Sequence, residues 1–436
     1  MIQFCAPSLS TTEASTRSGQ PTVQFLPVGK KLDSKDHETN VSHTSRLSGP
    51  VRRWEPPLYE YKPSTHLEFY NREGDNMMST FEPPVTMHPC DRTPLDMGGL
   101  SWILFGHAAF QYLNAACELN LYELLKEESG LSSEEIGQKL KLAPRATDIL
   151  LLGATSLGTL IVEDGRYRVA EIVSQLMDTD DWERFKDTVA FEQHVVYEGQ
   201  IDFTESLRNN SNVGLRRVRG TGGDLYRRLS ENPHMERIFY KYMRSWSELG
   251  NKQLVDNLDL SGATKLLDCG GGDGVNSIAL ARANPDLKCD ILEISETAPL
   301  TESRIAEAGL SDRISVRVGD MHEEEFPSGY DTVMFAHQFV IWTLEQNTEL
   351  LRKAYRVLPE GGQVIIFNSM SNDEGDGPII AALDSVYFAS LPAEGGMIYP
   401  WAKHEDCLEK AGFDPSKIRR LTFNGWTPHG AIVATK

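Results

Sequence analysis

Apolar side chains recur at helical spacing from about residue 100 of this chain. Phe110, Leu113, Cys117, Leu121 and Leu124 are three or four residues apart, so they fall on one face of a helix. The pattern therefore predicts a helix over this stretch that packs on a core by that face.

Two shorter helices and a hairpin are predicted next. Ser132 and Glu135 stand at the spacing of a capping box, which marks a helix start, and a further helix opens near Pro144. An Asp-Gly pair at 164–165, between two strand-like runs, is typical of a β-hairpin. Helices followed by a hairpin in this order indicate a winged-helix arrangement, and residues 180–260 are predicted to be mainly helical.

From residue 264 onward the pattern alternates between strands and helices. The predicted strands are Lys265–Cys269, Lys288–Ile294, Ile314–Val318, Asp331–Phe335 and Gln363–Asn368, with a helix over 275–283. This alternation predicts an α/β fold with a mostly parallel sheet and right-handed crossovers. Ligands of such sheets bind beyond the carboxyl ends of the strands.

These changes of pattern divide the chain into three parts. Residues 1–92 are rich in Ser, Thr and Pro without a sustained repeat, and they are predicted to be a disordered extension. Residues 93–250 form the predicted helical domain, and residues 251–436 form the predicted α/β domain. A cleaved organelle-transit segment within the first part stays an alternative, although its acidic residues argue against it.

Composition narrows the classes of function. The 436 residues carry 43 Lys+Arg against 63 Asp+Glu, a net charge of −20, and an acidic chain repels nucleic acid. The helix before the hairpin has one basic residue, Arg145, which argues against a DNA-binding winged helix. No apolar run is long enough to span a membrane. The six cysteines show neither disulfide nor metal-site spacing, and without a secretory signal they predict a cytoplasmic location.

A glycine-rich turn follows the first strand of the predicted sheet. Asp268 precedes Gly270, Gly272 and Gly274, and glycines at such a turn let the backbone approach a ligand at a helix N-terminus. A dinucleotide site would have a further glycine or alanine where this chain has Val275. The turn therefore indicates a ligand site of another kind.

Two further acids follow the next strands. Glu293 ends the second strand, where a carboxylate can accept both hydroxyls of a ribose. Asp320 follows the third strand and suits an adenine amino group, with Met321 packing on the ring. Each acid alone is compatible with a solvated loop, but acids at three successive strand ends predict a nucleoside-type ligand.

From about residue 100 to its end, the chain resembles the S-adenosylmethionine-dependent O-methyltransferases of plant, fungal and bacterial secondary metabolism. The Asp268–Gly274 turn is similar to the family's D-x-G-G-G-x-G, and Asp320 and Met321 match its adenine-binding pair. The family's F-x-x-x-M-x-x-x-S helix matches with Met243 and Ser247 at the positions that approach the cofactor. The resemblance implies S-adenosyl-L-methionine as cofactor, a Rossmann-like catalytic domain after a winged-helix dimerisation domain, a homodimer, and a small-molecule acceptor.

The chain departs from this family at the general base. The family's fourth strand runs into H-D-W, whose His deprotonates the acceptor, whereas these positions are Val340, Ile341 and Trp342 here. The family's G-G-x-E-R-T, whose Glu orients that His, has Ile398 at the Glu position. The residues at the base position and at the orienting position, Val340 and Ile398, are both apolar, which indicates that the two partner positions changed together.

His337 is the candidate replacement base. It stands three residues before Val340, and the two positions share a face if a helical turn begins at Ala336. The alternative is a histidine whose ring is satisfied by a backbone carbonyl. His194 is a candidate acceptor contact, and His234 is interpreted as a helix-start residue.

Three hypotheses of function follow from these residues. The first is in-line methyl transfer to an aromatic or polyketide-like metabolite, on oxygen, nitrogen or carbon. The second keeps the cofactor without net methyl transfer, as in family members that run cyclisation or pericyclic chemistry with the sulfonium charge. The third is a winged-helix regulator that senses the nucleoside, which the acidic charge opposes.

Overall fold

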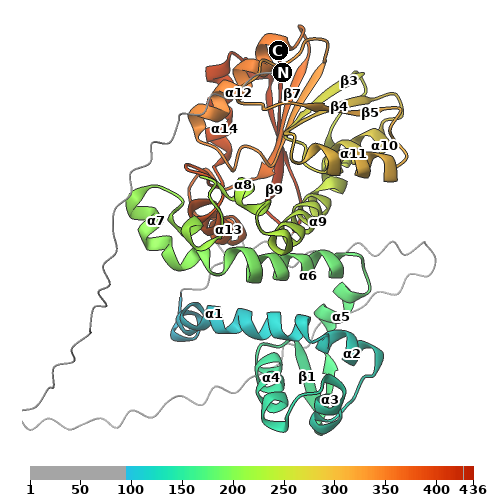
Figure 1. Ribbon diagram of the computed structural model, residues 1–436, viewed down its shortest axis with the longest axis vertical. Coiled ribbons are helices and arrows are strands. Elements are labelled where there is room, and N and C mark those ends of the chain that lie inside the picture. The colour runs from blue at the N-terminus through green and yellow to red at the C-terminus, as the bar shows by residue number, and fades with distance from the viewer. Residues whose placement is uncertain (1–94, 426) are drawn as a thin grey trace, which may run out of the picture. The chain divides into compact units, whose positions relative to one another are not determined.

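The computed structural model describes residues 95–425 and 427–436, and the predicted disordered extension over 1–92 lies outside them. The first half is helical with one β-hairpin (Figure 1). Its elements are α1 (Met97–Glu118), α2 (Leu121–Glu127), α3 (Ser133–Leu140), α4 (Pro144–Ser156), β1 (Leu160–Glu163), β2 (Arg166–Val169), α5 (Glu171–Met177), α6 (Asp181–Phe191), the π-helix Glu192–Val196, α7 (Phe203–Asn209), α8 (Leu225–Leu229) and α9 (Pro233–Asn257).

The predicted apolar stripe is divided between two helices. Asn120 has φ of 53°, in the left-handed region, and it separates α1 from α2. Leu121 and Leu124 therefore belong to a new helix, and the prediction of a single helix over these positions is wrong. The capping box is confirmed, because Ser132 and Glu135 each bond the other's backbone at the start of α3.

The second half contains a seven-stranded sheet with the order β5-β4-β3-β6-β7-β9-β8. The strands are β3 (Lys265–Cys269), β4 (Lys288–Glu293), β5 (Ile314–Val318), β6 (Thr332–Ala336), β7 (Gln363–Ser369), β8 (Ile418–Thr422) and β9 (His429–Thr435). The first five are parallel, and β9 runs antiparallel to both β7 and β8. The predicted α/β fold with a mostly parallel sheet is confirmed.

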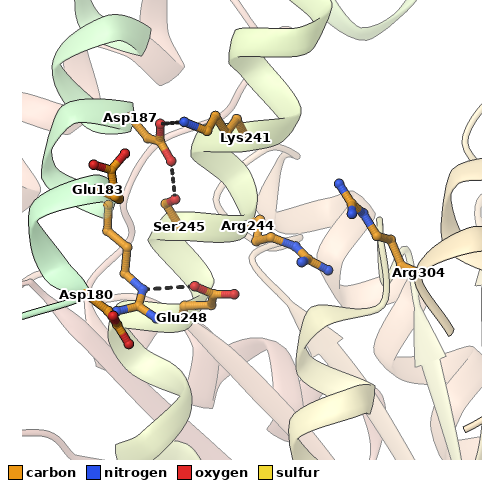
Figure 2. A pocket seen from close by; sticks show the side chains of 9 residues that line it. Asp180, Glu183, Asp187, Lys241, Arg244, Ser245, Glu248 and Arg304 are labelled. Carbon is orange, nitrogen blue, oxygen red and sulfur yellow. Dashed lines mark hydrogen bonds and ion pairs between the residues drawn. The ribbon is translucent and has the colours of Figure 1, made fainter. Parts of the chain in front are cut away.

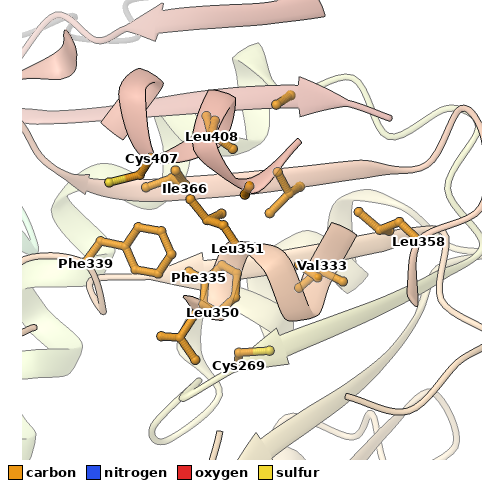
Figure 3. Close-up of a cluster of buried hydrophobic side chains, with 14 of the residues drawn as sticks. Cys269, Val333, Phe335, Phe339, Leu350, Leu351, Leu358, Ile366, Cys407 and Leu408 are labelled. Carbon is orange, nitrogen blue, oxygen red and sulfur yellow. The ribbon is translucent and has the colours of Figure 1, made fainter. Parts of the chain in front are cut away.

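Helices cover both faces of this sheet. They are α10 (Val275–Ala283), α11 (Ala298–Glu307), α12 (Leu344–Val357) and α14 (Trp401–Ala411), whereas α13 (Ile379–Ser390) packs against α7. A hydrophobic core lies on each face of the sheet, and alternate residues of β6 pack in one core or the other because successive side chains of a strand point to opposite faces. Val333 and Phe335 pack with α12 and α14, as Figure 3 shows, whereas Met334 and Ala336 pack in the core that includes α9 and α10.

The strand order makes the carboxyl end of β3 the topological switch point of the sheet. This strand pairs with β4 on one side and with β6 on the other, so the chain's connections diverge there. A point of this kind is where open α/β sheets bind ligands. None of the described helices is long and apolar enough to cross a membrane.

Helix α14 buries a histidine, which predicts a pH-dependent stability. His404 is fully buried, neither ring nitrogen has a hydrogen-bond partner within 95–425 and 427–436, and burial lowers its pKa to about 4 from 6.5. The unfolded chain therefore binds a proton below pH 6.5 that the folded chain does not, and stability is lost as the pH falls from 6.5 towards 4.

Wild-type protein should consequently lose about 2 kcal/mol more unfolding free energy than His404→Leu between pH 7.5 and pH 5. Urea unfolding of both proteins at the two pH values measures this difference, and the other titrating groups are common to both. Equal losses in the two proteins would contradict a neutral, buried His404.

Candidate functional site

The carboxyl ends of β3, β4 and β5 bring the three predicted acids together. The Glu293 carboxylate accepts hydrogen bonds from the backbone N–H groups of Gly272 at 2.8 Å and Ile294 at 3.0 Å. Burial raises the pKa of Asp268 to about 7, and the charge of Glu293 adds to this rise. Burial, and then the charge of Asp320, raises the pKa of Glu293 although both N–H groups oppose it. Because these carboxylates repel one another, a cationic ligand bound between them would stabilise their charged forms.

The glycine turn after β3 has the backbone that the sequence predicted. Gly270, Gly272 and Gly274 all have positive φ, between 57° and 80°, where side chains are strained. One carboxylate oxygen of Asp268 accepts from the Ser277 hydroxyl at 2.7 Å, but the other is buried and has no partner among the described residues. An orphaned acceptor beside an open glycine turn fits a ligand that brings its own hydrogen-bond donors.

Helix α9 is tied to this turn by an ion pair. Arg244 donates to Asp273 at 2.7 Å, within the stretch of glycines. Met243 and Ser247 are four residues apart on α9 and share the face beside Arg244. The ion pair fixes this segment of α9 at the glycine turn, and the cofactor contacts of Met243 and Ser247 stay predictions. Sequence reasoning missed Arg244, for which the only signal was its place inside the Met-x-x-x-Ser pattern.

The loop after β5 holds the remaining predicted pair. The Asp320 carboxylate accepts from the backbone N–H of His322 at 2.8 Å, which fixes its orientation. Met321 is 8% exposed and packs on the hydrophobic core, and Lys353 donates to its carbonyl oxygen at 2.9 Å. The hydrogen bond from Lys353 thus anchors the loop to α12, while a small part of Met321 stays exposed to solvent.

The end of β6 differs from the prediction. The turn there runs from Gln338 to Ile341, which are joined by a backbone hydrogen bond of 3.0 Å, and His337 precedes it with φ of 57°. The expected helical turn beginning at Ala336 is therefore wrong. Gln338, which the sequence did not single out, donates to the Gly270 carbonyl at 2.8 Å and joins the end of β6 to the glycine turn.

The left-handed backbone turns the His337 ring onto the face of the sheet that α9 covers. The ring centroid lies 4.7 Å from that of Phe367 and 5.2 Å from that of His429. The side chain is 6% exposed, and its Nε2 has no hydrogen-bond partner among the described residues. The alternative of a ring satisfied by a backbone carbonyl is thus not observed. Burial lowers the pKa of His337 to about 4, so the ring is neutral at neutral pH.

The positions of the family's base and orienting residue are packed into one apolar cluster. Val340, Ile341 and Ile398 are all buried and contact one another together with Ala381 and Ala393. Tyr226, Trp342 and Phe388 are partly buried and pack against this cluster. Hydrocarbon side chains thus occupy the positions at which the family has its base and its orienting residue.

Family models identify two regions of the chain. Residues 201–414 match the O-methyltransferase domain, and residues 102–179 match the O-methyltransferase dimerisation domain. The chain belongs to the O-methyltransferase family. The predicted resemblance is confirmed, as is a helical dimerisation region followed by a Rossmann-like methyltransferase sheet.

Two relatives of this methyltransferase are named for an aromatic compound on which they act. An L-tyrosine C(3)-methyltransferase of Streptomyces lavendulae is 72% identical over 353 residues, 81% of this chain and 96% of the relative. A 3-hydroxy-5-methyl-1-naphthoate 3-O-methyltransferase of Streptomyces sahachiroi is 29% identical over 75% of this chain and 91% of its own length. The solved apo structure of the S-adenosylmethionine-dependent methyltransferase SibL is 43% identical, with a TM-score of 0.70, and covers 78% of this chain and 99% of SibL. The chain is an S-adenosylmethionine-dependent methyltransferase.

A charged cleft of the methyltransferase is lined by residues of α6 and α9 and by Arg304 of α11, and it includes Arg244, which binds Asp273 of the glycine turn. It encloses about 340 Å³ between α6 and α9, and Figure 2 shows that its side chains face one another. Asp187 binds Lys241 and Ser245, and Arg184 binds Glu248. These ion pairs and hydrogen bonds join α6 to α9.

The two other predicted histidines lie together near α1. His194 Nε2 is 3.3 Å from a Glu118 carboxylate oxygen, and its ring lies 5.6 Å from that of His234. Helix α9 begins at Pro233, so the helix-start position of His234 is confirmed. The acceptor contact of His194 stays a prediction.

Proposed function

We propose that this methyltransferase places a methyl group on the ring carbon next to the hydroxyl of tyrosine or a close phenolic amino acid. The observation that carries the proposal is the 72% identity to an L-tyrosine C(3)-methyltransferase over 96% of that relative's length. The apolar cluster around Val340 supports it. A hydroxyl nucleophile gains most from a base placed against its oxygen, because that base removes the hydroxyl proton. An electron-rich ring carbon attacks with its ring electrons and loses its proton only after the new bond has formed.

We propose the predicted cofactor positions as the binding residues for S-adenosyl-L-methionine. Bound there, the cofactor supplies an electrophilic methyl group on a cationic sulfur. The mutually repelling acids and the orphaned Asp268 oxygen support this assignment. The proposed residues are Asp268, Gly270, Gly272, Gly274, Glu293, Asp320, Met321, Met243 and Ser247.

His337 is proposed to remove the proton from the methylated ring carbon. The ring carbon attacks the methyl group in line with the methyl–sulfur bond, whose electron pair stays on sulfur. The ring is then cationic, and loss of its carbon-bound proton to His337 Nε2 restores aromaticity. The buried, unpartnered Nε2 supports this role, as does the hydrogen bond by which the next residue, Gln338, joins this end of β6 to the glycine turn.

The low pKa of His337 favours this proton over the phenolic one. A phenol has a pKa near 10, so transfer to an imidazole with a pKa of about 4 is uphill by roughly 8 kcal/mol. A protonated aromatic ring is a far stronger acid than a phenol and gives its proton to a weak base readily. The depressed pKa therefore fits carbon methylation better than oxygen methylation.

The dimerisation region is proposed to join two copies of the chain. Helix α1 exposes more than half of the surface of four consecutive large apolar residues, Trp102, Ile103, Leu104 and Phe105. Apolar surface of this extent is typical of an interface. The match of residues 102–179 to a dimerisation domain supports a homodimer that covers α1.

Incubation with tyrosine and S-adenosylmethionine tests the proposed function. We expect one S-adenosylhomocysteine for each methylated tyrosine, and no reaction with phenylalanine, whose ring lacks the activating hydroxyl. A converted substrate of unchanged mass, without S-adenosylhomocysteine, would contradict methyl transfer and support the cyclase alternative. The methyltransferase relative at 72% identity does not favour that alternative.

A further inference from the structure

The backbone of His337 is strained at the point where the proposed base follows β6. Its φ of 57° lies in the left-handed region, which is costly for a residue with a Cβ. Strained backbone persists only where the surrounding structure holds it in place, and it is frequent at functional sites. The contacts that hold this backbone therefore bear on the role of the ring.

The strain decides on which face of the sheet the His337 ring lies. Ala336 packs in the core on the α9 side, so a continued strand would turn the next side chain to the opposite face. With the left-handed backbone, the ring instead packs against Phe367 and His429, whose ring centroids are 4.7 and 5.2 Å away. Relaxation of this backbone would withdraw the ring from these neighbours.

The side chains that receive the His337 ring are closely packed themselves. Gly250 of α9 lies so near that a Cβ there would meet the Phe367 ring at 2.8 Å and the His429 ring at 3.0 Å. The His429 Nδ1 atom is also hydrogen-bonded to the Thr427 hydroxyl at 2.7 Å. Neither neighbouring ring gives a hydrogen bond to His337 Nε2, so packing alone does not fix the orientation of the proposed base.

Gln338 ties the strained segment to the glycine turn. Its Nε2 donates to the Gly270 carbonyl at 2.8 Å. Gly270 has φ of 71°, and a Cβ there would lie 2.6 Å from the Gln338 amide carbon, so the two residues meet closely. On the other side, the backbone N–H of His337 donates to the Phe367 carbonyl at 2.7 Å. These two hydrogen bonds flank the left-handed residue.

The glycine turn has further hydrogen bonds of its own. The Gly270 N–H donates to the Leu292 carbonyl at 2.8 Å, and the Gly272 N–H donates to the Glu293 carboxylate at 2.8 Å. Loss of the Gln338 amide would leave both of these bonds in place. The tie therefore acts mainly on the end of β6, where it holds the strained backbone.

We propose that Gln338 is a positioning residue, which holds the left-handed backbone of His337 and thereby sets the ring in place for proton removal. The inference rests on the proposed function, in which His337 removes the proton from the methylated ring carbon. Gln338 acts through His337 in this assignment and contacts neither the acceptor nor the reacting atoms.

Gln338→Met tests the proposal, because methionine is similar in length and lacks the N–H donor. The kcat for tyrosine should fall about tenfold to 100-fold, since a misplacement of about 1 Å can cost about 100-fold. KM for tyrosine and the dissociation constant for S-adenosylmethionine should stay at their wild-type values. Gln338→Glu retains the size of the side chain without the donor and should behave in the same way. Wild-type kcat in both variants would overturn the proposal.

Gln346→Met is the matched control for this substitution. Gln346 is exposed and also bonds the backbone through its side chain, since its Oε1 accepts from the Thr343 N–H at 3.0 Å. The control therefore loses one backbone hydrogen bond close by in the chain, but none that reaches the glycine turn. It should keep the wild-type kcat, and an equal loss in Gln346→Met and Gln338→Met would overturn the proposal.

A deuterium isotope effect separates a misplaced base from a loss of folded protein. The substrate is tyrosine with deuterium at both ring positions next to the hydroxyl. In wild-type protein the positioned base makes proton loss fast, so labelled and unlabelled tyrosine should react equally. Gln338→Met should react more slowly with the labelled substrate, because a misplaced base makes proton loss slow. A lower kcat without this isotope effect would overturn the proposal.

NMR of protein labelled at histidine Cε1 and saturated with S-adenosylhomocysteine requires no turnover. The His337 resonance, assigned with His337→Ala, should shift in Gln338→Met and keep its place in Gln346→Met. An unchanged resonance in Gln338→Met would overturn the positioning role. A shifted resonance in a protein that does not methylate tyrosine would support the tie and overturn only the proposed function.

Discussion

Glu293→Ala is expected to raise the dissociation constant for S-adenosylmethionine about 100-fold, since hydrogen bonds to a charged group contribute about 1.5–3 kcal/mol each. The carboxylate stands at the end of β4 and is held in place by the N–H groups of Gly272 and Ile294. Its remaining lone pairs can accept two ribose hydroxyls. Removing it deletes both proposed contacts and one of the negative charges that attract the cationic cofactor. Isothermal titration calorimetry measures the change.

Two further variants separate binding from folding at this position. Glu293→Gln keeps one acceptor oxygen and removes the charge, so its loss of affinity should be intermediate. Glu296→Ala changes an exposed carboxylate three residues later and should leave the dissociation constant unaltered. If Glu293 serves only the fold, Glu293→Gln should lower the unfolding temperature while affinity stays at the wild-type value, and that outcome would rule out the ribose contact.

His337→Ala is expected to lower kcat about 100-fold or more, because a positioned base contributes about 10²–10⁴-fold. Cofactor affinity should be retained, since His337 accepts a proton from the acceptor ring in the proposed mechanism. Wild-type kcat should be constant around neutral pH and fall as the pH approaches about 4, where His337 becomes protonated. Stopped-flow or steady-state assays across this range give both quantities.

His404→Ala is the matched control for this variant. His404 has the same depressed pKa of about 4 and the same lack of ring hydrogen bonds, but it lies on α14, against the opposite face of the sheet. Both variants should lose stability, whereas only His337→Ala should lose kcat and the acid limb of the pH profile. Equal kcat in the two variants would remove the proposed role of His337.

Local sequence patterns were sufficient to predict most of the catalytic fold. Strand starts at Lys265, Lys288 and Gln363 were predictable because buried parallel strands read as short apolar runs bounded by turns. The acids at their ends were predictable because parallel strands bring successive loops to one edge of a sheet. The break at Asn120 was not, because the left-handed backbone there interrupts an apolar stripe that continues unchanged in the sequence.

Features that depend on distant segments could not be read from the sequence. The His337 ring reaches the α9 face only because its backbone is left-handed, which no neighbouring residue signals. Phe191 and Tyr387 come from separate halves of the chain, and their rings meet edge to face with centroids 5.1 Å apart.

The most direct test of carbon methylation uses tyrosine carrying deuterium at both ring positions next to the hydroxyl. Transfer to a ring carbon must expel one deuteron, so mass spectrometry of the product should show a methyl group gained and one of the two deuterons lost. Transfer to the phenolic oxygen or to the amine would keep both. A methylated product that retains both deuterons would contradict the central claim that this enzyme methylates the tyrosine ring.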